Sequence, residues 1–278
     1  MPPQPAGNLF ATGPAYVFGS LWGNRRLVLQ MARRDLVERY RGSVFGFLWS
    51  LFNPILMLAV FTFVFTVVFR ARWPATAGTN AEFAVNAFVG MIVYGLFAES
   101  VGRAPSLVIQ NAHLVKKVVF PLEVLPWVAM ASSVFHAAIS FVVLVAFTIV
   151  VTGSPKATVL LLPVVVIPVV LLSLGLSWFL ASLGVFLRDT SHTVPLLITA
   201  LMFVSPIFYP LSAAPENVRW VLALNPLAGA IEDSRSVALG GVIPDPSGFV
   251  LLLVGSAAVA WGGLWWFMRT KHTFADVL

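Results

Sequence analysis

The sequence predicts an all-α integral membrane protein with six transmembrane helices. The first observation is the composition: 59% of the 278 residues are apolar and only 10% are charged. In a soluble domain about a quarter of the residues are charged. Segmentation is the second, because the apolar residues gather in stretches of about twenty, the length an α-helix needs to cross a bilayer. Lipid must therefore cover most of the surface.

The chain divides into a flexible cytoplasmic tail, residues 1–21, and a single transmembrane domain, residues 22–278. The tail lacks a basic segment and a long apolar run, so we do not expect a cleaved signal peptide. The six expected spans are, in order, about 47–69, 84–102, 124–151, 158–186, 193–211 and 248–268.

The distribution of Lys and Arg predicts that both termini are cytoplasmic. With that orientation 12 basic residues flank the spans on the cytoplasmic side and 5 on the opposite side. This bias follows the positive-inside rule, and an even number of spans agrees with it. The net charge of +6 is therefore explained by topology, and we expect no nucleic-acid partner.

Residues 22–43, before the first span, are expected to form an amphipathic helix along the cytoplasmic interface. Arg34 and Glu38 are spaced to form an i,i+4 ion pair, as are Asp35 and Arg39. The apolar side of this helix is expected to contain Leu29, Ala32, Leu36, Val37 and Tyr40.

Two further segments are too polar or too short to span. Residues 103–123 form a cytoplasmic loop with room for a short packed helix. Residues 212–247 are apolar on both sides of Asn225 and Pro226, which favours two re-entrant half-helices in the outer leaflet before the last span.

The residue types needed for catalysis are scarce. Cysteine is absent, the four histidines show no metal-ligand spacing, and no lysine follows a glycine as in a phosphate-binding loop. We therefore expect no catalytic residue, metal or cofactor in this chain. Glu99 and Asp189 lie near span ends, where water or a neighbouring Arg satisfies them. Glu232, Asp233 and Arg235 could form either a gate or a solvated rim.

Aromatic residues follow one side of the first span and are candidates to line a channel, because sugar rings stack on aromatic faces. Helix packing and lipid contact remain alternatives, since Phe and Trp are common in membrane helices. The candidates are Phe45, Trp49, Phe52 and Phe63. A second set lies on the opposite side: Phe47, Phe61, Phe65 and Phe69.

Three ordered motifs resemble the permease subunits of bacterial ABC exporters for O-antigen, capsule and teichoic acid polymers. The first motif comprises Arg34, Asp35, Arg39, Tyr40, Ser43, Gly46, Trp49 and Pro54. The second comprises Lys117, Phe120, Pro121, Glu123, Leu125 and Pro126. The third is the outer gate segment with Asn225, Pro226, Glu232 and Arg235. Leu122 departs from the family, where relatives often carry a basic residue.

The resemblance implies a homodimer in the bacterial inner membrane with a channel between the two copies. It also implies two copies of a separate cytoplasmic ATPase, which would bind ATP and Mg²⁺. The substrate would be a polysaccharide linked to undecaprenyl diphosphate. Coupling to the ATPase would fall to Arg34, Asp35, Arg39, Lys116, Lys117 and Glu123.

Two other classes stay open at this stage. One is an ABC-type permease for a drug or small lipid, and the other is a proton-coupled carrier that would need no ATPase. A membrane enzyme has less support, because no acid, base or metal set is clustered in the sequence.

Overall fold

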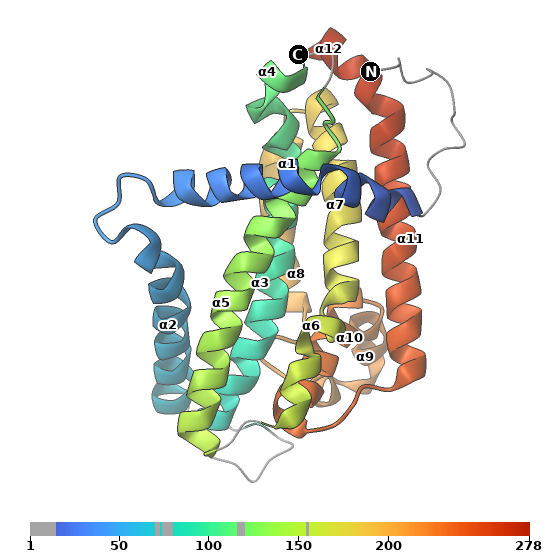
Figure 1. Ribbon diagram of the computed structural model, residues 1–278. Helices are drawn as coiled ribbons and strands as arrows, with labels where there is room; N and C mark the ends of the chain where they lie inside the picture. The colour runs from blue at the N-terminus through green and yellow to red at the C-terminus, as the bar shows by residue number, and fades with distance from the viewer. Residues whose placement is uncertain (1–14, 70–72, 74–79, 116–119, 154–155) are drawn as a thin grey trace.

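The computed structural model describes residues 15–69, 73, 80–115, 120–153 and 156–278. These residues form helices joined by short connections (Figure 1). The α-helices are α1 (Ala15–Tyr40), α2 (Trp49–Thr62), α3 (Asn80–Gln110), α4 (Ala112–Val115), α5 (Val124–Thr152), α6 (Leu162–Val165), α7 (Ile167–Phe186), α8 (Thr190–Val204), α9 (Glu216–Ala223), α10 (Pro226–Arg235), α11 (Pro246–Thr270) and α12 (Phe274–Val277). Short 3-10 or π segments are η1 (Gly46–Leu48), η2 (Phe63–Val68), η3 (Ala157–Leu161), η4 (Leu211–Ala213), η5 (Ser236–Gly240) and η6 (Lys271–Thr273).

The all-α membrane architecture predicted from the sequence is confirmed. Within the described part of the chain, five helical stretches are long and apolar enough to cross a membrane. They are Gly46–Phe65, Glu82–Gln110, Val124–Val150, Ala157–Phe186 and Pro246–Val277. The stretch expected at 193–211 is the shorter apolar helix α8, which ends at Val204 because Pro206 follows.

The interface helix α1 lies across the long helices rather than along them (Figure 1). It begins at Ala15, so residues 15–21, expected in the flexible tail, are helical instead. Val17 and Ser20 are buried, and the Trp127 indole N–H donates to the Ser20 hydroxyl at 3.3 Å. These contacts with α5 extend the helix toward the N-terminus. Residues 1–14 of the expected tail lie outside the described residues.

The buried side of α1 differs from the side expected from apolar spacing. Val28 and Ala32 are buried, but Leu29 and Val37 are exposed. The helix is turned so that the Asp35 carboxylate reaches a basic partner on α3. An ion pair that periodicity could not reveal thus sets the rotation of this helix.

Helix α3 continues eight residues past the span end expected at 102, through Pro105 to Gln110. The expected loop 103–123 is therefore half helix, followed by the single turn α4. The Pro105 carbonyl lies against Gly184 of α7, where a Cβ atom would come within 2.0 Å of its oxygen. Tight packing against α7 holds this end of α3 in place.

Helix α7 lies between α3 and α11, and glycine residues permit a close backbone approach to each of them. Gly184 faces α3, and Gly175 faces α11. A Cβ atom on Gly175 would lie 2.4 Å from the Val259 carbonyl oxygen, and one on Gly263 would lie 2.0 Å from the Gly175 oxygen. Hydroxyl pairs accompany these contacts, Ser100 with Ser177 at 3.2 Å and Ser182 with Thr270 at 2.7 Å. Small residues and hydroxyl pairs are how helices associate in lipid.

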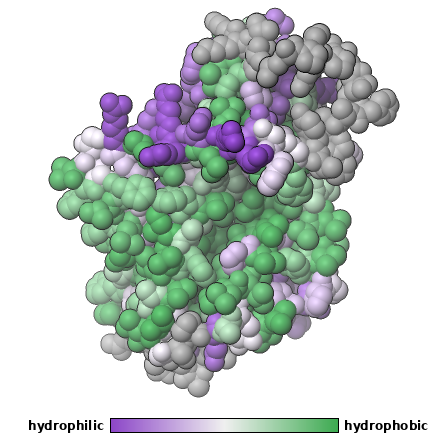
Figure 2. Space-filling view, in the orientation of Figure 1, coloured by the Kyte–Doolittle hydropathy of each residue, from purple (hydrophilic) through white to green (hydrophobic). Residues whose placement is uncertain are grey.

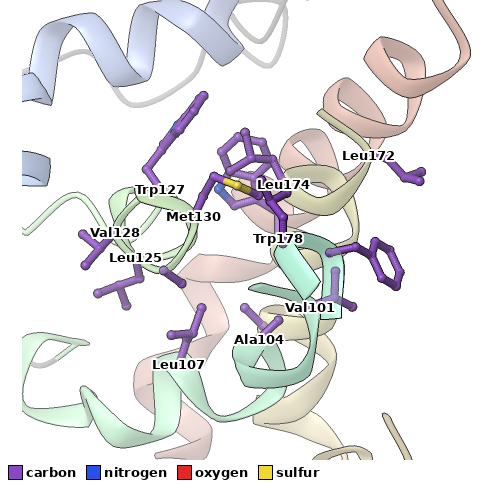
Figure 3. Packing of buried hydrophobic residues seen from close by; sticks show 14 of the residues in the cluster. Val101, Ala104, Leu107, Leu125, Trp127, Val128, Met130, Leu172, Leu174 and Trp178 are labelled. Carbon is purple, nitrogen blue, oxygen red and sulfur yellow. The ribbon is translucent and has the colours of Figure 1, made fainter. Parts of the chain in front are cut away.

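The main apolar core forms where α3, α5 and α7 meet under α1 (Figure 3). Trp127 and Trp178 pack edge to face there, with ring centroids 5.7 Å apart. Trp178 is fully buried, and its indole N–H donates to the Glu123 carbonyl at 3.0 Å. A buried Trp with its donor satisfied connects α7 to the start of α5.

The two half-helices expected within 212–247 are α9 and α10, separated at Leu224 and Asn225. They lie at the end of the bundle opposite α4 and α12 (Figure 1). On the face shown in Figure 2, hydrophobic side chains cover the long helices, and hydrophilic residues form a row along α1. This distribution fits an α1 that marks one boundary of the apolar region.

The α7–α11 contact generates a prediction with an adjacent control. Gly263→Ala should lower the midpoint of thermal unfolding in detergent, because overpacking a tight contact costs about 1–3 kcal/mol. Gly262→Ala should be neutral or slightly stabilising, since nothing lies within 4 Å of its Cβ position and Ala favours helix. Equal midpoints for the two variants would contradict the close approach.

Candidate functional site

An ion pair anchors α1 to the bundle. Arg103 of α3 donates to both Asp35 oxygens at 2.5 and 3.0 Å, and the Ser132 hydroxyl of α5 donates to Asp35 at 2.8 Å. Burial of the Asp35 carboxyl raises its pKa, but the hydrogen bonds from Arg103 and Ser132 lower it further, so the pKa lies below its ordinary value. The pair therefore stabilises the fold above the unfolded pKa of about 3.9, and this stability is lost as the pH falls through the folded pKa.

A groove of about 470 Å³ opens beside this ion pair, between α1, α4 and the end of α3. Its floor is apolar, with Leu27, Met31 and Leu107, and charged side chains such as Arg34 and Glu38 stand along its rim. Arg34 and Glu38 form the expected i,i+4 pair at 2.6 Å. An apolar floor with a charged rim is typical of a surface that binds another protein.

The residues expected to couple to an ATPase are dispersed. Arg34 lies on the groove, whereas Arg39 points away from it and pairs with Glu99 of α3 at 2.5 Å. The i,i+4 spacing predicted that Asp35 pairs with Arg39, and this was wrong. Asp35 pairs with Arg103 instead. Glu123 is 5% exposed and pairs with Lys271 at 3.3 Å.

Lys116 and Lys117 lie outside the described residues. Internal pairs thus engage Asp35, Arg39 and Glu123, and contact with an ATPase stays a prediction.

A second polar cluster lies where the end of α1 meets α3 and α5, beside α2. Glu99 accepts from Arg39 and lies 3.0 Å from His136 Nδ1. The other ring nitrogen of His136 is 2.9 Å from the Tyr40 hydroxyl. The cluster lines a cavity of about 490 Å³ that also contains Trp49. Glu99 thus has the neighbouring Arg that the sequence suggested.

Exposure does not separate the two aromatic sets, because Phe47 and Phe69 of the second set are 54% and 65% exposed. Phe45, Phe52 and Phe63 are each more than half exposed, and Trp49 contacts Phe45 and Phe52 at centroid distances of 5.6 and 5.4 Å. By contrast, Phe61 packs on Phe208 at 5.7 Å. Phe45, Phe52 and Phe63 therefore point away from the bundle, whereas Trp49 lines the cavity beside Glu99 and His136.

At the opposite end, Arg235 joins three elements. Its guanidinium donates to the Asn86 carbonyl of α3 at 3.0 Å, to the Ile207 carbonyl at 2.5 Å and to Glu232 at 3.3 Å. It also lies 4.7 Å from the centroid of the Trp73 ring. Arg235 is 4% exposed and so does not belong to a solvated rim. Burial lowers its pKa to about 10, with Glu232 opposing the shift, and the group stays charged at neutral pH.

Asn225 and Pro226 begin α10. The Asn225 side chain accepts from the Leu227 N–H at 3.0 Å and donates to the Ser205 hydroxyl at 2.9 Å. Pro226 takes the first helical position, where its missing N–H has no helical partner to lose. The four expected gate residues therefore lie on one short helix: Asn225 and Pro226 begin α10, and Glu232 and Arg235 near its other end bind the backbone of Leu211 and Ile207.

Comparison with known proteins identifies the family, because the model for ABC-2 type transporters matches residues 26–239. This chain belongs to the ABC-2 type transporter family. An O-antigen export system permease protein RfbA from Myxococcus xanthus is 31% identical over 92% of this chain and 96% of its own length. A protein of the same name from Klebsiella pneumoniae is 30% identical over 91% and 95%. The polysialic acid transport protein KpsM of Escherichia coli is 21% identical over 76% and 81%.

This ABC-2 family member is a multi-pass membrane protein, and several of its central residues were not expected from the sequence. In the sequence, Arg103 is one of the 12 basic residues that indicate topology, and His136 is one of the four histidines without metal-ligand spacing. Ser132 and His136 are spaced i,i+4 on a mostly apolar helix, and polar residues inside a membrane span are functional candidates. That spacing was the available signal for a polar face of α5 turned toward α1.

The Arg235 network generates a prediction about charge geometry. Arg235→Lys should lower the free energy of unfolding by about 2 kcal/mol or more, because one ammonium nitrogen cannot reach acceptors that the guanidinium reaches from three nitrogens. Arg269→Lys is the control, since Arg269 is exposed and contacts only the Trp265 ring at 5.5 Å among the described residues. Similar losses for both variants, measured by thermal unfolding in detergent, would contradict the role of this network.

Proposed function

We propose that this chain is the membrane-spanning channel subunit of an ATP-driven exporter. The substrate is a polysaccharide of the O-antigen class, carried on undecaprenyl diphosphate and moved across the bacterial inner membrane. The observation that carries the proposal is similarity along almost the whole chain to proteins named O-antigen export permeases. The chain covers 95–96% of these relatives, so the similarity extends beyond one shared segment.

The exposure of α2 supports a channel between two copies of the chain. Only 17% of the first span is buried within the protomer, and the residues of α2 that are buried are Ser50, Pro54 and Leu58. Of its aromatic stripe, Phe45, Phe52 and Phe63 point outward, and Trp49 contacts Phe45 and Phe52 from the edge of the cavity. In a homodimer, stripes of this kind would offer a polymer many weak stacking contacts, which suits a substrate that must slide.

The groove beside α1 supports an ATPase partner at the cytoplasmic face. It lies at the end of the bundle that carries most of the Lys and Arg residues, the side expected to be cytoplasmic. We assign ATP and Mg²⁺ to two copies of that separate ATPase, because this sequence has no phosphate-binding loop. Both termini would then be cytoplasmic.

Arg235 and its partners supply a candidate outer gate. The network holds α10 against α3 and against the segment that follows α8. Opening at this end would require Arg235 to exchange these carbonyls for other acceptors. Asn225 and Pro226 fix where α10 begins, and Glu232 holds the Leu211 N–H at 3.0 Å.

A deletion and rescue experiment tests the function. Removing the gene for this chain should abolish surface O-antigen and leave lipid-linked polymer inside the cell. Wild-type chain should restore export, but not when the phosphate-binding lysine of the partner ATPase is replaced by alanine. Normal surface polymer in the deletion strain would contradict the proposal, and rescue with an inactive ATPase would favour a proton-coupled carrier.

The two aromatic sets generate a second test. Phe52→Ala should slow export at equal protein level and equal ATPase co-purification, because it removes one stacking surface, and aromatic pairs contribute about 0.5–1.5 kcal/mol beyond area burial. Phe61→Ala should instead lower the thermal midpoint, since Phe61 packs on Phe65 and Phe208. Normal export by Phe52→Ala together with failed export by stable Phe61→Ala would show that the two sides are assigned wrongly.

A further inference from the structure

The cavity of about 490 Å³ between α2, α3 and α5 is a second candidate site that the channel stripe does not account for. We propose that it binds one neutral sugar unit of the transported polymer, an inference that rests on the function proposed above. Its volume is within the range of about 300–1,000 Å³ found for small-molecule sites. The site is separate from the groove beside α1, which is lined by different faces of α1 and α3.

The lining combines one large aromatic ring with planar polar groups. Trp49 and Met57 of α2 supply apolar surface, while Asn53, Glu99 and His136 supply an amide, a carboxylate and an imidazole. A sugar ring has an apolar C–H face and a rim of hydroxyl groups. An indole and planar hydrogen-bonding groups match those two features, because each hydroxyl can donate and accept.

Charge favours a neutral ligand over a phosphate. Arg39 pairs with Glu99 at 2.5 Å, so the only guanidinium in the lining is already neutralised. A phosphate oxygen approaching Arg39 would also approach the Glu99 carboxylate, and like charges at such distances repel. His136 is held between Glu99 and the Tyr40 hydroxyl. Hydroxyl groups of a sugar can hydrogen-bond to this pair without a charge penalty.

Two donors in the cavity have no internal partner. Within the described residues, neither the Asn53 amide nor the Trp49 indole N–H makes a hydrogen bond. Asn53 is exposed within the protomer and Trp49 is half-buried, so both donors are accessible from the cavity. Both residues are on α2, one turn apart, and a ligand oxygen in the cavity would satisfy them.

The cavity is continuous with the aromatic stripe through Trp49. This ring lines the cavity and also contacts Phe45 and Phe52 edge to face. Trp49 begins α2, close to the end of α1. A sugar unit bound here would therefore lie at the α1 end of the stripe, where a polymer entering from the cytoplasmic side would first meet it.

Asn53→Ala in the complete exporter, purified with its ATPase and placed in liposomes, tests the site. The Asn53 amide makes no hydrogen bond within the described residues, so Asn53→Ala leaves no internal polar group unpaired. The probe is lipid-linked polysaccharide extracted from the source bacterium, and the readout is its stimulation of ATP hydrolysis. We expect the half-stimulating concentration to rise about 3- to 10-fold, the effect of one neutral hydrogen bond.

Two controls separate the possible ligands. Sugar-free undecaprenyl diphosphate is the second probe, and its half-stimulating concentration should be the same for wild type and Asn53→Ala. An equal shift with the sugar-free carrier would overturn the proposal in favour of phosphate or lipid recognition. Leu56→Ala, an exposed residue on the same helix outside the cavity lining, should shift neither probe.

A second variant protects the test against a folding defect. Trp49→Phe keeps an aromatic face and loses the indole N–H, so it should shift the polysaccharide response in the same direction as Asn53→Ala. No shift for either variant would overturn the sugar subsite while leaving the exporter function intact. Wild-type protein that responds to neither probe, together with normal surface polymer in the deletion strain, would overturn the proposed function itself.

Discussion

The close approach of α7 to the backbones of α3 and α11 is the constraint on which the rest of the structure depends. In a bilayer no hydrophobic force drives helices together, since lipid tails are as apolar as Leu, and contact distance decides association. Gly175, Gly184 and Gly263 permit carbonyl oxygens to lie where a Cβ atom would otherwise be. The position of α3 follows from that contact, and both polar clusters are built on α3.

Helix α3 carries a partner for each end of the molecule. Arg103 near one end holds α1 through Asp35, and the Asn86 carbonyl near the other end accepts from Arg235. Glu99 lies between them and holds Arg39. Helix α1 and the half-helix α10 are thus fastened to one continuous element, whose own place is set by α7. Loss of Asp35 would leave the Arg103 guanidinium without its carboxylate, and loss of Arg235 would leave the Asn86 and Ile207 carbonyls without this donor.

Apolar content and segment length predicted the helical membrane fold and the approximate place of five of the six expected spans, while the stretch expected at 193–211 is the shorter helix α8. They failed where a single contact decides a boundary or a rotation: Pro105 does not end α3, and the rotation of α1 follows Asp35 rather than its apolar side. The gate residues could be grouped from the sequence because they are close in the chain. The Asp35–Arg103 pair and the Glu99–His136 cluster could not, because they join residues far apart, and distance along a sequence carries no information about which helices become neighbours.

The sparse packing of α2 has a consequence for how the chain is made. As the first span to be synthesised, α2 enters the bilayer before α3 and α5 exist. It is stable there alone, because nearly all of its surface is apolar and can be covered by lipid. Its later neighbours meet it along one narrow line, through Ser50, Pro54 and Leu58. The most deeply buried span, α3, follows directly, with 78% of its apolar window enclosed by the rest of the chain. Insertion therefore begins with the span that buries the least surface against the other helices. The span that buries the most, α3, can reach its final packing only after α7 and α11 have entered the membrane.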